Sequence, residues 1–139
     1  MNPILRNILA VIAGILIGGA VNMGLILLGS SMLPPPAGVD VNDVASINAH
    51  IGEYSIAQLL APFLAHALGT LAGAFLVAKL AASRKMALAL VIGGVNLLGG
   101  IMAVRMIPAA PLWFDVLDLG FAYVPMAWLG GRMGDGAAR

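Results

Sequence analysis

The sequence predicts an all-α integral membrane protein, a four-helix bundle with a short interfacial helix in its first extracytoplasmic loop. Hydrophobic residues make up 61% of the chain and charged residues 9%, against about 25% charged residues in soluble domains. The mean hydropathy is +1.02. The apolar residues form four continuous runs that suit membrane helices of about 20 residues. Strands of a membrane barrel would instead alternate in hydrophobicity over about 10 residues.

Residues 1–139 are expected to form a single transmembrane domain. The predicted spans cover residues 5–29, 56–80, 86–107 and 112–130. A cleaved signal peptide is the alternative for the first run, because Arg6 precedes it. We favour a retained helix, since signal peptides have apolar regions of about 7–15 residues. Gly14 and Gly18 in this span suit close helix packing.

The first loop, residues 31–55, is the long polar segment of the chain. Its three prolines at 34–36 cannot continue a helix. Asn42 or Asp43 can cap a short helix that Gly52 ends. Its apolar face would consist of Val44, Ile47 and Ile51. The pattern indicates an amphipathic helix at the membrane surface, with a merely structured loop as the alternative.

The remaining helix boundaries carry their own signals. Ser55 and Gln58 match a capping box that opens the second span, and Pro62 is expected to bend it. A short basic turn at 81–85 and a proline-containing turn at 108–111 lead into the third and fourth spans. Residues 131–139 are expected to form a short mobile tail.

The basic residues predict the orientation. In this four-span arrangement one side holds Arg6, Lys79, Arg84, Lys85, Arg132 and Arg139. Arg105 approaches the other side, where Asp40, Asp43 and Glu53 lie. Lys and Arg favour the cytoplasmic side of a membrane. We therefore expect a multi-pass protein of the plasma (inner) membrane with both termini in the cytoplasm.

Each predicted span carries one strongly polar side chain in the outer half of the membrane: Asn22, His66, Asn96 and Asp118. At 1.5 Å per residue, their depths come to about 10–15 Å below the outer surface. Each also shares a helix face with small residues, which mark the faces where membrane helices approach closely. The four residues are therefore predicted to converge in one outward-facing polar cluster.

His66 has two interpretations that the sequence leaves open. It can be a packing residue that hydrogen-bonds an Asn or a backbone carbonyl, or it can form a proton-titrating pair with Asp118. Arg105 and Asp115 flank the turn at 108–111 and are predicted to form a structural ion pair, since an unpaired charge in the bilayer costs roughly 3 kcal/mol. No metal site or cofactor is expected, because one histidine lies in the spans and the chain has no cysteine.

Two stretches carry a resemblance. Residues 63–74, which contain His66, and residues 111–128, which contain Asp115 and Trp128, resemble small four-helix bacterial inner-membrane proteins. The resemblance covers most of the chain and implies a bacterial inner-membrane setting. It implies no activity.

The predicted function is that of a non-enzymatic membrane protein, either a packing or accessory subunit or a self-associating bundle. The alternative is a small proton- or ion-coupled transporter or channel with an outward-facing polar pocket. No nucleophile–base pair, metal cluster or phosphate-binding loop indicates an enzyme. The expected partners are the lipid bilayer and a second copy or another membrane protein. The net charge of +1 gives no electrostatic footprint for nucleic acid.

Overall fold

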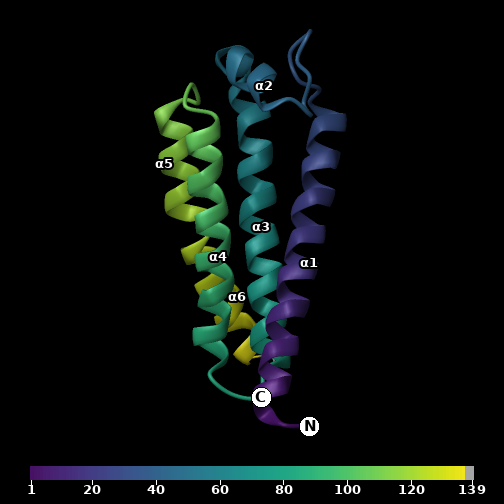
Figure 1. Ribbon diagram of the computed structural model, residues 1–139, viewed down its shortest axis with the longest axis vertical. Coiled ribbons are helices and arrows are strands. Elements are labelled where there is room, and N and C mark those ends of the chain that lie inside the picture. Colours follow the sequence, from purple (N-terminus) through teal and green to yellow (C-terminus); the bar gives the residue numbers. More distant parts are fainter. Residues whose placement is uncertain (137–139) are drawn as a thin grey trace.

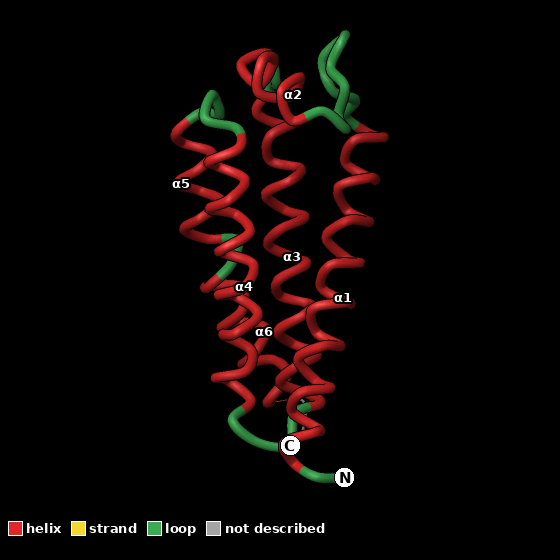
Figure 2. Tube along the Cα trace, in the orientation of Figure 1, coloured by secondary structure: helices red, strands yellow, loops and turns green. Residues whose placement is uncertain are grey.

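The computed structural model describes residues 1–136, and every regular element in this part is helical. The elements are α1 (Pro3–Met32), α2 (Val44–His50), the 3₁₀ turn η1 (Ile51–Glu53), α3 (Ile56–Leu80), α4 (Lys85–Met106), α5 (Leu112–Phe121) and α6 (Val124–Gly136). Within these residues, four helical segments are long and apolar enough to cross a membrane, with α5 and α6 together forming the fourth. Figures 1 and 2 show them as a helical bundle with the N-terminus and the end of α6 at the same end. The predicted helical class is confirmed, together with four helical segments that are long and apolar enough to span a membrane.

Helix α3 is the centre of the bundle, because α1 packs on one side of it and α4 and α6 pack on others. The α1–α3 contact depends on glycines. A Cβ atom on Gly73 would lie 2.6 Å from the carbonyl oxygen of Gly14, and one on Gly18 would lie 2.8 Å from the carbonyl oxygen of Gly69. The two backbones therefore touch near the middle of the helices. They lie farther apart toward α2 (Figure 1), where an added Cβ on Gly29 would still lie 3.0 Å from Cβ of Ala61.

The N-terminal turn of α1 holds the connection between α3 and α4. The side-chain oxygen of Asn7 accepts hydrogen bonds from the backbone N–H groups of Ala82 (2.9 Å) and Ser83 (3.3 Å). Arg6 donates from Nε to the carbonyl oxygen of Leu80 at 2.7 Å, which satisfies one of the free carbonyls at the end of α3. Arg84 adopts a left-handed conformation, with φ of 50°, as it reverses the chain.

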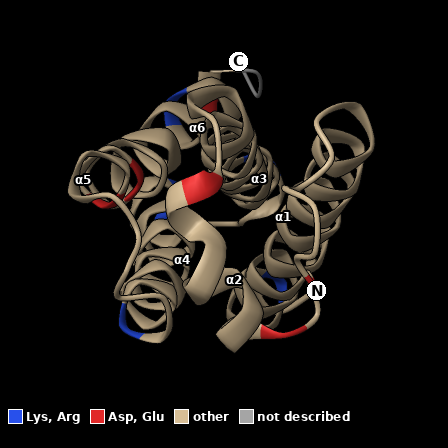
Figure 3. Ribbon diagram, turned by 90° about the horizontal axis from the view of Figure 1, so that it is seen from above, with Lys and Arg blue, Asp and Glu red and all other residues tan. Residues whose placement is uncertain are grey.

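The loop before α3 forms the helix that the sequence predicts. Asp43 caps α2 by accepting a hydrogen bond from the N–H of Ala45 at 3.0 Å. Ser55 and Gln58 form the expected capping box, with distances of 2.7 and 3.2 Å. α2 lies beyond the N-terminal end of α3 (Figure 1), and the half of the bundle at this end is called the outer half below, after its predicted orientation. The acidic residues around α2 face the viewer in Figure 3. Contact between α2 and a membrane surface stays a prediction.

The fourth span differs from the expected continuous helix. α5 ends at Phe121, and α6 begins at Val124. Pro125 has no N–H to donate to the carbonyl of Phe121, so the chain turns just before it. The expected mobile tail is also wrong for residues 131–136, which are helical, and Asp135 forms an ion pair with Lys85 at 3.3 Å. Arg139, included in the predicted charge distribution, lies outside the described residues.

Candidate functional site

Three polar side chains meet in the outer half of the bundle. Nδ1 of His66, on α3, lies 2.8 Å from Oδ1 of Asp118, on α5. The hydroxyl of Tyr123, from the turn between α5 and α6, donates to Oδ2 of Asp118 at 2.6 Å and lies 3.1 Å from Nδ1 of His66. The rings of His66 and Tyr123 stack with centroids 5.8 Å apart. These residues are called the His66 cluster below.

Burial makes the hydrogen bonds of this cluster important. Asp118 is 4% exposed and Tyr123 is also 4% exposed. A charged carboxylate within a bilayer costs roughly 3 kcal/mol, so each carboxylate oxygen needs a partner, and each has one. Nδ1 of His66 and Oδ1 of Asp118 are close enough to share one hydrogen bond. The cluster can therefore hold a proton and pass it between an acid and an imidazole.

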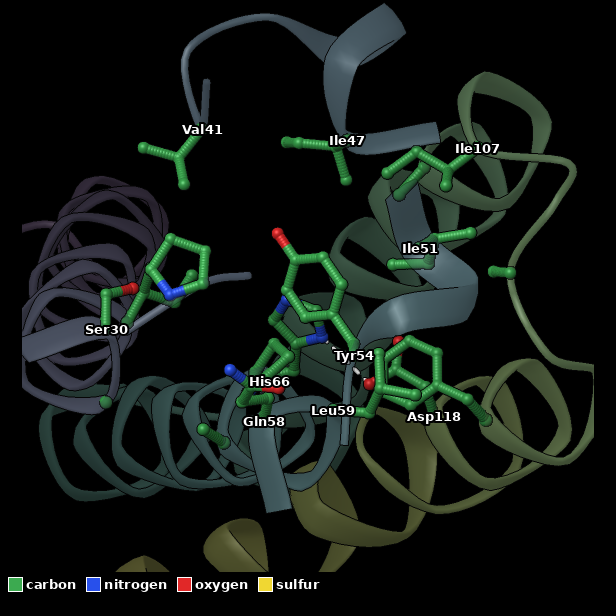
Figure 4. Close-up of a pocket in the computed structure, with 18 of the residues that line it drawn as sticks. Ser30, Val41, Ile47, Ile51, Tyr54, Gln58, Leu59, His66, Ile107 and Asp118 are labelled. Carbon is green, nitrogen blue, oxygen red and sulfur yellow. Dashed lines mark hydrogen bonds and ion pairs between the residues drawn. The ribbon is translucent and has the colours of Figure 1, made fainter. Parts of the chain in front are cut away.

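A cavity of about 370 Å³ lies between α2 and the His66 cluster. Its apolar lining includes Ile26, Ile47, Ile51, Leu59, Ile107 and Phe114. Its polar lining is Ser30, Tyr54, Gln58, His66, Asp115 and Asp118. In Figure 4, Val41 and Ile47 lie on one side of this outer cavity, with His66 and Asp118 across from them. The cavity is thus an apolar chamber with two acids and an imidazole in its lining.

Tyr54 contributes an aromatic ring to the outer cavity from just before α3. The side chain extends into the cavity (Figure 4). Burial raises the pKa of the Tyr54 phenol above its ordinary value, so the hydroxyl stays protonated at neutral pH. Tyr54 therefore adds a ring and a neutral hydroxyl to this chamber, and no charge.

A second cavity of about 310 Å³ lies between α1, α3 and α4. Asn22, Thr70 and Asn96 line it together with His66 and Tyr123. Asn96 donates from Nδ2 to Oγ1 of Thr70 at 2.9 Å. The side-chain oxygen of Asn22 is buried and has no hydrogen-bond partner among residues 1–136. His66 lines both cavities, together with Gly100 and Ala103.

The predicted cluster is therefore present as two polar groups that share His66. His66 and Asp118 bond directly, whereas Asn22 and Asn96 reach them through the second cavity. The sequence reasoning missed Tyr123. The sequence feature that could have identified Tyr123 is a tyrosine in the middle of a predicted span, because a buried Tyr hydroxyl usually requires a hydrogen-bond partner.

The predicted Arg105–Asp115 ion pair does not form. Among the described residues no ion pair joins them, and Arg105 is exposed while Asp115 is half-buried beside the outer cavity. Arg105 lies nine residues after Asn96, or about two and a half helical turns, and so projects from the opposite face of α4. The two residues lie at similar depth beside one turn, but the rotation of α4 directs Arg105 away from Asp115.

No protein family, curated protein or solved structure matches this chain. The resemblance to small bacterial inner-membrane proteins thus has no matching family behind it. Within residues 1–136, no three His, Cys, Asp or Glu side chains are grouped to hold a metal ion. The chemistry that the geometry offers is proton exchange next to an apolar cavity.

Proposed function

We propose that this chain is a small proton-linked membrane transporter that binds a solute in the outer cavity. One observation carries the proposal: a buried acid, Asp118, bonds to His66 and Tyr123 and lines a cavity of about 370 Å³. Small-molecule sites in proteins are mostly apolar cavities of about 300–1,000 Å³ with a few polar groups. The role is non-enzymatic, because a proton moves and no bond to carbon changes.

Solute binding and protonation would be coupled because both take place at the same residues. A solute that contacts Asp118 or His66 changes the free energy of protonating them, and protonation changes the affinity for the solute by the same factor. An acid in a membrane-spanning segment is costly, and such residues in transporters commonly belong to proton relays. The His66 cluster would couple the two events in this way.

The proposed setting is the plasma (inner) membrane, with both termini cytoplasmic and the outer cavity facing outward. Charge supports this orientation. The end of the bundle with the N-terminus holds Arg6, Lys79, Arg84, Lys85 and Arg132, and basic residues favour the cytoplasm. A reporter fused after residue 139 should report cytoplasm, and one inserted in loop 37–53 should report exterior. The reverse pattern would contradict the orientation.

The transport proposal is tested by proton flux into liposomes. Purified protein is reconstituted into liposomes that contain a pH-sensitive dye, and a potassium gradient with valinomycin sets the membrane potential. With small organic solutes supplied inside the liposomes one at a time, wild-type protein should acidify the lumen several times faster than empty liposomes do for at least one of them. Asp118→Asn should return the rate to that of empty liposomes, because the amide cannot carry the proton.

Two further variants distinguish the loss of the proton-carrying group from the loss of the folded structure. Asp135→Asn removes an acid that pairs with Lys85 at the opposite end of the bundle, so it should retain the wild-type rate. Tyr123→Phe keeps the acid and removes one hydrogen bond, so the rate should change without vanishing. If wild-type protein adds no flux, or if Asp118→Asn matches it, the proposal is wrong.

Self-association is a second candidate function, supported by glycines on the surface of the bundle. A Cβ atom on Gly24, Gly94 or Gly120 would meet nothing within 4 Å, so these positions leave room for a second copy. The glycines at 14 and 18, by contrast, are already used against α3. Light scattering of the purified protein and of Gly94→Leu tests this role. A monomeric wild-type protein would exclude it.

A further inference from the structure

The charges in the outer cavity are all of one sign. Asp115 and Asp118 line it, and no Lys or Arg does so among the described residues. Asp118 has its partners in His66 and Tyr123. Asp115 is half-buried, and in residues 1–136 its side chain has neither an ion-pair nor a hydrogen-bond partner. The chamber therefore contains a carboxylate with no cation from the protein to balance it.

We propose that the outer cavity binds a small organic cation with an apolar body, such as a substituted ammonium ion, with its charge beside Asp115. In naming the solute, we build on the proposed transport function. The cation would supply the counter-charge that the protein does not. An opposite charge within a few ångströms is worth far more in such a chamber than in bulk water.

The rest of the chamber suits the body of such a molecule. Ile47, Leu59 and Ile107 line it with aliphatic side chains, and burial of apolar surface contributes about 25 cal/mol per Å². Tyr54 and Phe114 add aromatic rings, whose faces attract ammonium groups. Apolar and aromatic surface thus surrounds the two carboxylates.

The other solute classes fit less well. An organic anion would meet two carboxylates without a basic side chain among the described lining residues. A neutral apolar molecule would cover Asp115 and leave its charge uncompensated, which is costly in a desolvated site. A strongly polar neutral solute would gain nothing from contact with the apolar side chains of the lining. The cation is the class for which each part of the lining has a use.

The charged and titratable groups around Asp115 and Asp118 are few. α3 contributes His66, the segment before it contributes Tyr54, and the turn after α5 contributes Tyr123. The lining residues from α1, α2 and α4 are uncharged, and Arg105 of α4 points away from the chamber. A bound cation would hold its counter-acid in the ionised form, so cation and proton would compete, and affinity should fall as the pH is lowered.

The test compares two probes that share one body and carry opposite charges. Benzyltrimethylammonium and phenylmethanesulfonate are titrated by calorimetry into the full-length protein in an uncharged detergent. The cation should bind saturably, and the anion should bind at least about tenfold more weakly, because the carboxylates attract one and repel the other. Equal binding, tighter binding of the anion, or no binding of the cation would overturn the proposal.

Variants locate the charge contact. Asp115→Asn should weaken cation binding by about tenfold or more, and Asp115→Glu should restore most of it. Asp135→Asn, the control at the other end, should leave binding unchanged. If Asp115→Asn folds and binds the cation as tightly as the wild type, the assigned contact is wrong.

The two proposals fail separately. If cation binding occurs without proton flux in liposomes, the solute class stands and the transport function is wrong. If proton flux occurs and the cation does not bind, transport stands and the solute class is wrong.

Discussion

The inner and outer halves of the bundle are built on the same two helix faces with side chains of different size. On α1 the face that meets α3 reads Gly14, Gly18, Asn22 and Ile26 from the inner end outward. On α3 the matching face reads Gly73, Gly69, His66 and Pro62. The glycine pairs bring the backbones into contact, whereas the larger residues line the two cavities.

The difference explains where the cavities lie. In the inner half, the helices pack closely around a core of Ala74, Val77, Ala78, Ala89, Ile92 and Ala127. In the outer half, the backbones of α1 and α3 lie farther apart (Figure 1), and larger side chains from both helices line the two cavities. The inner half provides stability, and the outer half provides the space and polar groups that a function requires.

The largest expected effect is in the inner half. Gly73→Ala should destabilise the protein by about 1–3 kcal/mol, because overpacking forces the backbones apart and the new Cβ would lie 2.6 Å from the carbonyl oxygen of Gly14. Gly24→Ala is the matched control, since nothing lies within 4 Å of its added Cβ. Unfolding in detergent measures both. Equal stability of the two variants would mean that α1 and α3 do not touch as described.

A smaller effect is expected in the outer half. A double-mutant cycle of His66→Ala and Asp118→Ala should show a coupling free energy of about 1 kcal/mol, the typical size of a hydrogen bond between side chains. The same cycle with His66→Ala and Asp135→Asn should show none, because these residues lie at different levels of the bundle. Additive effects of His66→Ala and Asp118→Ala would contradict the observed pair.

The smallest effect concerns the pair that the sequence suggested and the structure lacks. Arg105→Ala and Asp115→Ala should be additive in stability within about 0.5 kcal/mol, as expected for groups that do not interact. The double variant should equal the sum of the single ones in the same unfolding assay. A larger coupling would show that the two charges approach each other, and it would also remove the uncompensated acid from the outer cavity.

The sequence by itself determined the helical class, the four long apolar segments, the capped loop helix and the polar residue of each segment. Long continuous apolar runs without the alternation of barrel strands form helices in lipid, because the polar groups of the backbone then bond within the segment. Caps such as Ser55–Gln58 and Asp43 are local and follow from a few neighbouring residues. Periodicity also placed His66 and Asp118 on packing faces, where they are found.

Only the tertiary structure decided which of these polar residues meet. Tyr123 follows Asp118 by five residues, which in an unbroken helix would place it on a different face. The turn before Pro125 interrupts the helix and brings the hydroxyl of Tyr123 to 2.6 Å from the carboxylate of Asp118. Arg105 does not reach Asp115, because α4 is an unbroken helix and its rotation places the Arg105 side chain on an exposed face. Sequence distance gives depth in a bundle, whereas helix rotation and helix breaks decide contact.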